Sequence, residues 1–347
     1  MRPPGRPKGE YRRAKPEGSP VTHPTCAQRQ RGAALLLAML ILTLVATMAS
    51  GMVWQQWRAI QVESAERART QSAWILLGAL DWARLILRED ARTGGADHLG
   101  EPWAVPLAEA RLSSFLAADR DNNSAAESDG IEAFLSGSIT DAQSRWNLRK
   151  LIDADGKVAP AQLRVLARLC EQAGLPGASA ERIALALRKA WAPKVAAAPG
   201  TAPEEAFIAP QRLAELSWLG IDADTLRRLE PWVTLLPSAD TRVNVNTAAA
   251  EVIAAAVDGM SLGSAQRLLQ ERQRTPLRDL GAAATRAYFP ADPQTQLDGV
   301  GVASRFFWVQ GRLRLGQRVL EERSLIERRQ LDIVVLARER INLRETN

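Results

Sequence analysis

Histidine and cysteine are scarce in this chain, which has two of each among 347 residues. His98, in a glycine-rich segment, is the one histidine outside the basic N-terminal region, so histidine-based catalysis and histidine-rich metal sites are nearly excluded. Cys26 and Cys170 give no disulfide framework. His-Glu-x-x-His and Cys-x-x-Cys motifs are absent, and Gly299-Val300-Gly301 lacks the third glycine of a dinucleotide-binding loop. We therefore expect that the protein is not an enzyme.

The net positive charge is confined to the N-terminal segment. Residues up to Gly32 include eight basic and two acidic side chains, so this segment carries the whole net charge of +6, and the rest has 37 residues of each sign. A protein body without net positive charge has no general attraction for the phosphate backbone of nucleic acids. The basic segment therefore indicates targeting rather than nucleic-acid binding.

An apolar run without a single charge follows this basic segment. Residues 33–53 read AALLLAMLILTLVATMASGMV. As a helix this run is about 32 Å long, which matches a hydrocarbon core of about 30 Å. Trp54 and Trp57 come next, as at a membrane interface, and the positive-inside rule places the N-terminus in the cytoplasm. We expect one membrane-spanning helix with the rest of the chain on the other side.

Several kinds of N-terminal signal could contain such a run. A conventional signal peptide has a shorter apolar stretch and would be cut near Ala49 or Gly51, whereas a simple anchor would stay uncut. A lipoprotein signal is excluded because Cys26 precedes the apolar run. Arg31-Gly32 directly before Ala33 resembles the cleavage site of a type IV prepilin leader, which is cut before the helix so that the helix is retained. We favour this last interpretation.

The helix is predicted to continue past the membrane segment to residue 90. No proline occurs between Pro24 and Pro102, and apolar or small residues recur at intervals of three and four from residue 65 to residue 86. This spacing gives a helix with one apolar face. We expect an amphipathic stem that packs against a globular domain.

The sequence after residue 90 predicts an α+β fold. In this fold a long N-terminal helix packs on a small antiparallel sheet, and a large all-helical domain is inserted into the sheet. Residues 137–151 and 304–345 are expected to form strands, with Gly311 and Gly316 at turns. Six segments between residues 159 and 280 have helical spacing, and Asp222 and Asn246 are the expected N-caps of two of them. The expected divisions are a basic leader at 1–32, a transmembrane helix at 33–53, a stem at 54–90, an α/β part with an acidic loop at 91–158, the inserted helical domain at 159–290 and C-terminal strands at 291–347.

Five segments together resemble the K minor pseudopilin family of the type II (general) secretion pathway. They are Arg31-Gly32 before AALLLAMLILTLVA, LDWARLILRED at 80–90, GSITDAQSRWNLRKL at 137–151, WVTLLPSADTRVNVNTAAAEVIAAAV at 232–257 and SRFFWVQGRLRLG at 304–316. The resemblance implies a pilin-like fold, cleavage by prepilin peptidase between Gly32 and Ala33, and methylation of Ala33. It also implies an inner-membrane protein with a periplasmic C-terminal domain. Its partners would be the I and J minor pseudopilins and the major pseudopilin, in a filament that exports folded exoproteins across the outer membrane.

Leu37 is the fifth residue of the expected mature chain, where most pilins and pseudopilins have a glutamate. In such filaments that carboxylate is thought to pair with the N-terminal amine of a neighbouring subunit, because an unpaired charge inside a membrane is costly. The K pseudopilins resemble this sequence in lacking the acid, and their family role is at the filament tip. We therefore expect this chain to initiate and cap the filament.

The alternative function is a pilin-like tip protein of a type IV pilus or DNA-uptake pseudopilus. Residues 243–272 resemble a helix-hairpin-helix, but the turn at 257–261 has one of the two glycines that present N–H groups to phosphate, and it adds Asp258. We interpret this segment as a helical packing module and do not expect nucleic-acid binding. A third possibility is an ordinary membrane-anchored periplasmic protein.

Calcium is the one cofactor that the sequence suggests. Asp119, Asp121 and Asn123 begin like an EF-hand loop, but the turn glycine and the final glutamate are missing. The family resemblance implies calcium binding by clustered acids in the helical domain, where this chain offers Glu204 and Glu205. Since calcium needs six or more oxygen ligands, a solvated acidic loop is the default expectation and calcium is the alternative.

Overall fold

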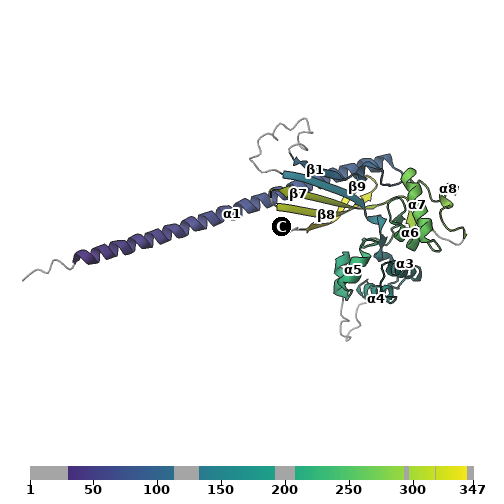
Figure 1. Cartoon of the computed structure of the whole chain (residues 1–347), viewed down its shortest axis with the longest axis horizontal. Coiled ribbons are helices and arrows are strands. Elements are labelled where there is room, and N and C mark those ends of the chain that lie inside the picture. Colours follow the sequence, from purple (N-terminus) through teal and green to yellow (C-terminus); the bar gives the residue numbers. More distant parts are fainter. Residues whose placement is uncertain (1–29, 113–132, 192–207, 293–296, 317, 342–347) are drawn as a thin grey trace, which may run out of the picture. The chain divides into compact units, whose positions relative to one another are not determined.

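The computed structural model describes residues 30–112, 133–191, 208–292, 297–316 and 318–341 (Figure 1). These residues divide into two units, with the boundary between Ala68 and Arg69. Helix α1 (Gln30–Thr93) contributes to both units. In the first unit, the side chains of residues 33–67 are exposed.

A five-stranded antiparallel sheet forms the centre of the second unit. Its strand order is β1-β2-β7-β8-β9. The strands are β1 (Leu107–Arg111), β2 (Ala133–Asp141), β7 (Phe306–Leu315), β8 (Arg318–Arg329) and β9 (Asp332–Ile341). Neighbours β2 and β7 pair along their whole length, from Ala133 opposite Leu315 to Asp141 opposite Phe307. The residues between these two strands in sequence form a separate helical region, so this region is an insertion into the sheet (Figure 1).

The second-unit part of α1 packs against one face of the sheet, as the amphipathic pattern predicted (Figure 1). The buried stem residues recur at intervals of three and four residues: Ser72, Leu76, Leu80, Ala83 and Leu87. They meet apolar side chains that point from the same face of the sheet: Leu135, Ile139, Phe307, Val309, Leu313 and Ile326. Ile75, Ala79 and Ile86 belong to the regularly spaced residues between 65 and 86 that predicted the apolar face, but they are half-buried at its edge. The buried face is therefore rotated by one residue from the predicted one.

Gly311 lies inside β7, opposite Gly137 of β2, so its expected place at a turn is wrong. A Cβ atom at Gly311 would lie 3.2 Å from Cδ2 of Leu76 in α1, and one at Gly137 would lie 2.8 Å from the carbonyl oxygen of Gln310. Gly311 therefore allows the stem to approach the sheet closely, whereas Gly137 avoids a clash with the backbone of the neighbouring strand β7. Gly316, between β7 and β8, has φ +56° and forms the predicted turn.

The inserted region is mainly helical but also contains two short parallel strand pairs, β3–β4 and β5–β6, so it is not all-helical as expected. In chain order its elements are η3 (Ala142–Ser144), β3 (Trp146–Asn147), η4 (Leu148–Leu151), α3 (Pro160–Gln172), α4 (Ser179–Trp191), η5 (Leu213–Leu219), α5 (Ala223–Leu229), β4 (Val233–Thr234), β5 (Val243–Asn244), α6 (Ala250–Ala256), α7 (Leu262–Arg274), α8 (Ala283–Arg286) and β6 (Val300–Gly301). One apolar cluster contains side chains from all of these elements except η3 and α8, from Trp146 to Val300.

Hydrogen bonds from side chains to the backbone explain where the structure follows the predicted elements and where it departs from them. The strand expected at 137–151 ends at Asp141, because the Asp141 carboxylate accepts a hydrogen bond from the Gln143 backbone N–H and starts the 3₁₀ turn η3. Asp222 caps α5 as predicted, accepting from the Thr225 backbone N–H at 2.8 Å. Asn246 is not an N-cap, because its amide pairs with the backbone of Leu277. The sequence KVAAAPGTAP at 194–203, which is typical of a connector, lies outside the described residues.

Candidate functional site

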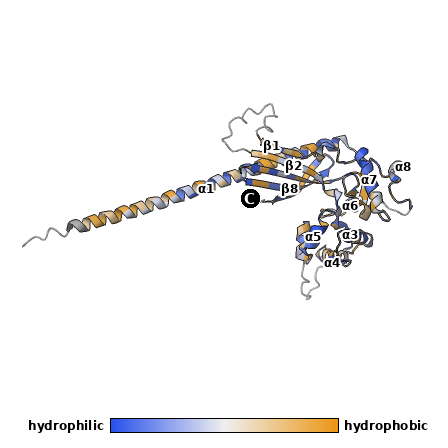
Figure 2. Cartoon of the chain, in the orientation of Figure 1, coloured by the Kyte–Doolittle hydropathy of each residue, from blue (hydrophilic) through white to orange (hydrophobic). Residues whose placement is uncertain are grey.

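The N-terminal part of α1 has the composition of a membrane-spanning segment. Figure 2 shows mostly apolar residues here, and none of the most apolar stretch is buried within the protein. Three hydroxyl groups in this stretch donate to backbone carbonyls one turn earlier, at 2.8–2.9 Å: Thr43 to Leu40, Thr47 to Leu44 and Ser50 to Ala46. A hydroxyl group that is hydrogen-bonded within its own helix is tolerated in a hydrocarbon environment that offers no water. The helix is therefore suited to lipid on all its sides.

The charged end of this stretch is also suited to a membrane surface. The guanidinium of Arg58 lies over the indole of Trp54, 5.5 Å from the ring centroid. Tryptophan and arginine side chains are favoured at the boundary between hydrocarbon and water. At the other end, Gly32 and Ala33 have helical backbone, and the uncharged side chain of Leu37 is exposed.

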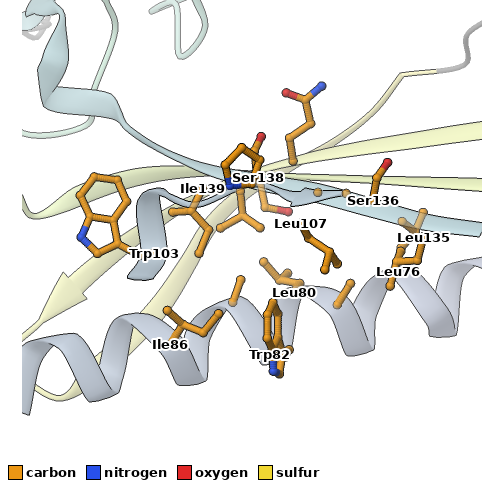
Figure 3. Close-up of a pocket in the computed structure, with 18 of the residues that line it drawn as sticks. Leu76, Leu80, Trp82, Ile86, Trp103, Leu107, Leu135, Ser136, Ser138 and Ile139 are labelled. Carbon is orange, nitrogen blue, oxygen red and sulfur yellow. The ribbon is translucent and has the colours of Figure 1, made fainter. Parts of the chain in front are cut away.

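A groove lies between the stem and the β1–β2 edge of the sheet (Figure 3). Its volume is about 230 Å³, and its walls are largely apolar. Leu76, Leu80 and Ile86 line it from α1, Trp103 lines it from η1 (Pro102–Ala104), and Leu107 lines it from β1. A groove of this volume with apolar walls has room for a small apolar group.

Arg328, in β8, connects the end of the stem with the loop that follows it. Its Nη2 donates to both carboxylate oxygens of Asp97 at 2.6 Å and to the carbonyl oxygen of Ser304 at 2.7 Å, and its Nη1 donates to Asp90 near the end of α1. The guanidinium also lies 5.0 Å from the ring centroid of Phe307. Because the Arg328 side chain is only 13% exposed, these charged hydrogen bonds lie in a place with little water, where they are stronger than at the surface.

Asp141, at the end of β2, is buried and enclosed by hydrogen-bond donors. Its Oδ1 accepts from the Gln143 backbone N–H at 2.7 Å. Its Oδ2 accepts from the hydroxyls of Thr247 and Ser304, each at 2.6 Å, and from Nδ2 of Asn244 at 3.0 Å. Neutral donors alone therefore satisfy this carboxylate.

Asn244, in β5, extends this network to Asp97. Its Nδ2 lies 3.1 Å from the Asp97 carbonyl oxygen and 3.0 Å from the Ser304 hydroxyl. The Ser304 backbone N–H donates to Asp97 Oδ2 at 2.6 Å. We call the five connected side chains the polar junction: Asp97, Asp141, Asn244, Ser304 and Arg328.

Burial raises the pKa of the carboxyl groups in and beside the polar junction. Loss of solvation raises the pKa of Asp141 to about 6, although hydrogen bonds from two hydroxyls and a backbone amide lower it. Burial also raises the pKa of Asp97, against the opposing effect of Arg328. Burial and the nearby Glu101 raise the pKa of Asp90 to about 6, again against Arg328. Asp90 and Asp141 therefore change charge in a mildly acidic range.

Asp90, Asp97 and Glu101 form an acidic triad. Their ligand atoms lie within 4.8 Å of one another, a separation at which three carboxylates could hold a metal ion. Asp90 and Asp97 are already bonded to Arg328, and Glu101 accepts from the indole N–H of Trp103 at 2.7 Å. A metal ion would therefore have to displace the cation that the protein itself supplies, and calcium would still lack most of its oxygen ligands.

The sequence did not predict this triad or the polar junction. The calcium ligands that it suggested all lie outside the described residues: Asp119, Asp121, Asn123, Glu204 and Glu205. A signal for the triad was present in the three acids within a short glycine-containing stretch, but their spacing matches no metal-binding motif. Only the fold brings Arg328 to them.

The helix-hairpin-helix-like segment is built as a packing module. Arg272 donates to the carbonyl oxygens of Val245 and Ala248, and burial lowers its pKa to about 10. Arg168 donates to the carbonyl oxygen of Ala255 at the end of α6. These arginines bind the protein's own backbone, which leaves them unavailable to phosphate.

Ser261 stands in a Gly-x-Ser-x-Gly sequence, from Gly259 to Gly263. In nucleophilic serine enzymes this motif follows a strand, whereas here it lies between α6 and α7. The Ser261 hydroxyl accepts from the Ser264 backbone N–H and caps α7. The motif is therefore structural.

Comparison with protein families gives two matches. Two family profiles, both described as type II secretion system protein K, match residues 144–238 and 243–303. Both ranges lie within the region inserted between β2 and β7.

Curated proteins with similar sequences extend the likeness over most of the chain. The type II secretion system protein K of Pectobacterium carotovorum subsp. carotovorum is 29% identical over 322 residues, which cover 86% of this chain and 92% of that protein. The protein of the same description from Pseudomonas aeruginosa is 28% identical over 312 residues, covering 83% and 86%.

A solved structure has the same fold. It is the crystal structure of the GspK-GspI-GspJ complex from the type 2 secretion system of enterotoxigenic Escherichia coli. One chain of that complex aligns with a TM-score of 0.57 and 19% identity, covering 80% of this chain and 99% of that chain. The long helix on an antiparallel sheet with a helical region is thus shared with that protein.

Proposed function

Because the chain belongs to the type II secretion system protein K family, we propose that it lies at the tip of the pseudopilus, where it initiates and caps the filament. The family is one of minor pseudopilins, which are structural proteins rather than enzymes. Leu37 is the observation that carries the tip role. A subunit without an acid at this position has no charge with which to bind a neighbour's N-terminal amine inside the membrane-derived helix bundle.

Processing at Gly32 and Ala33 is the first step of the proposed function. Prepilin peptidase would cut between these residues on the cytoplasmic side, and Ala33 would then be methylated. The apolar part of α1 would keep the mature chain in the inner membrane, with the sheet and the inserted region in the periplasm. The expected divisions of the chain, from the leader at 1–32 to the strands at 291–347, belong to this proposal.

The N-terminus of the mature protein tests this processing. We expect the chain extracted from membranes to begin at Ala33 and to carry the mass of one additional methyl group, because the leader is removed before the helix. Intact-mass measurement and N-terminal sequencing of the detergent-extracted protein would show this directly. A chain that begins near Ser50 or Met52, or one that is uncut, would contradict the proposal.

The proposed partners are the I and J minor pseudopilins and the major pseudopilin. The solved structure with this fold is a complex of a K protein with an I and a J protein, which supports this choice. In this arrangement the growing filament would push folded exoproteins through an outer-membrane channel.

Loss of the protein tests the secretion role. We expect deletion of the gene to retain folded exoproteins in the periplasm, because filaments would lack their initiating subunit. Activity assays of exoproteins in medium and periplasm would measure this, and the full chain supplied in trans should restore export. A variant with residues 33–53 replaced by a cleavable signal peptide is the matched control, since its periplasmic domain would be present but unanchored, and export should not return. Normal export without the gene would contradict the role.

The DNA-uptake alternative makes a different prediction for the same protein. Its periplasmic part would bind DNA with an affinity that falls steeply with salt. The internal bonds of Arg168 and Arg272 disfavour it. Calcium stays the alternative to a solvated acidic loop, with two separate sets of candidate ligands: Asp119, Asp121 and Asn123 in one, and Glu204 and Glu205 in the other.

A further inference from the structure

The second unit contains two separate apolar cores. One core fills the inserted region and includes Trp146, Leu187 and Ile253. The other lies between the stem and the sheet and includes Leu87 and Phe307. Among the described residues, these two clusters share no buried side chain. Something other than a common apolar core must therefore fix the position of the inserted region on the sheet.

A small apolar cluster lies where the inserted region meets the sheet. It contains four buried side chains, from Ala142, Leu236, Phe306 and Leu325. Apolar contacts of this kind are non-directional, so they favour closeness without fixing one orientation. Polar contacts supply a second connection between the inserted region and the stem–sheet core.

Buried hydrogen bonds supply the directional contacts between the cores. The Asn244 amide and the Thr247 hydroxyl come from the inserted region and bond to Asp141, at the end of β2. Asn244 also reaches Asp97, which Arg328 ties to the end of the stem. If the inserted region shifted, the Asn244 amide and the Thr247 hydroxyl would lose their bonds to Asp141, and the loss of buried hydrogen bonds is costly.

We propose that the polar junction is a latch that makes the two cores one cooperative unit. While it is intact, the inserted region holds one orientation on the sheet, and both cores open together. When it is broken, the inserted region moves about the two chain segments that leave β2 and enter β7. It then also unfolds independently of the stem–sheet core. Through the latch, the position of the stem determines the orientation of the inserted region, whichever partners the stem or the inserted region binds.

Two buried asparagines allow a matched test of this latch. Asn244→Leu removes an amide whose bonds to Asp97 and Asp141 cross between the inserted region and the stem–sheet core. Asn147→Leu removes an equally buried amide that bonds to Ser238 and Thr241, both within the inserted region. Both variants lose buried hydrogen bonds, but only the first loses contacts between the cores.

Hydrogen exchange of the full chain in detergent, followed by mass spectrometry, distinguishes the two effects. In the wild type, the slowest amides of α3 and of β8 should exchange at the same rate, because both require global unfolding. Asn147→Leu should increase the exchange rates of the slowest amides in α3 and in β8 by the same factor. Asn244→Leu should speed exchange in α3 by at least about ten-fold more than in β8, because the inserted region then opens alone.

A second pair of variants tests the latch from the side of the sheet. Arg328→Met removes the ion pair with Asp97 in the latch, so it should also make the exchange rates of α3 and β8 differ. Arg338→Met removes an ion pair with Glu322 inside the sheet, so it should leave the two rates equal to each other. The proposal is overturned if the wild type already shows separate rates. It is also overturned if, in Asn244→Leu and in Arg328→Met, the exchange rates of α3 and β8 increase by the same factor.

Discussion

Replacing Trp103 with alanine should lower the free energy of unfolding by about 3–5 kcal/mol. The Trp103 side chain is 1% exposed and packs edge-on against Phe307, with ring centroids 5.2 Å apart. Its indole N–H also donates to Glu101. The change therefore leaves a large cavity at the stem–sheet core and removes a charged hydrogen bond. Chemical unfolding of the full chain in detergent, monitored by circular dichroism, would measure the loss.

Trp74 provides the matched control for this prediction. It lies on the stem, whereas Trp103 lies in η1, and the Trp74 side chain is 67% exposed, so Trp74→Ala should change the free energy of unfolding by no more than about 0.5 kcal/mol. Both variants lose one indole ring, and only the environment differs. Equal losses in the two variants would contradict the packing of η1 against the stem and sheet.

The parts of the fold that depend on local sequence were predictable. The uncharged run and the amphipathic spacing after it predicted α1, because a helix face is set by residues three and four positions apart. The same spacing predicted α4, which runs from Ser179 to Trp191. Asp222 caps α5 because its carboxylate reaches an N–H group only three residues away.

The polar junction could not be predicted in this way, because its members are far apart in the sequence. Arg328 bonds to Asp90 over 238 residues, and Asn244 bonds to Asp97 over 147 residues. No local spacing records which buried acid meets which donor. The predicted position of Gly311 at a turn was wrong for a related reason. Glycine favours turns, but Gly311 instead leaves space for Leu76, which belongs to a helix more than two hundred residues away in sequence.

Titration of Asp141 should make the protein lose stability as the pH rises from about 4 to about 6. Burial raises the pKa of Asp141 from its ordinary 3.8 to about 6 in the folded protein. Between these values the folded state binds a proton that the unfolded chain releases, so protonation favours the folded state and this advantage disappears above the folded pKa. A shift of this size corresponds to roughly 3 kcal/mol. Asp141→Asn should remove this part of the pH dependence, as shown by chemical unfolding at a series of pH values.

The difference between wild type and Asp141→Asn isolates this group, because the raised pKa values of Asp90 and Asp97 act in the same direction in both proteins. Asp222 is a control of opposite sign: hydrogen bonds from Thr225 lower its pKa, so its contribution is present at neutral pH and lost as the pH falls. Asp222→Asn should therefore weaken the protein at neutral pH and not at acidic pH. A wild type and an Asp141→Asn variant with parallel pH profiles would mean that Asp141 titrates normally. In that case the ring of neutral donors, and not burial, would control its charge.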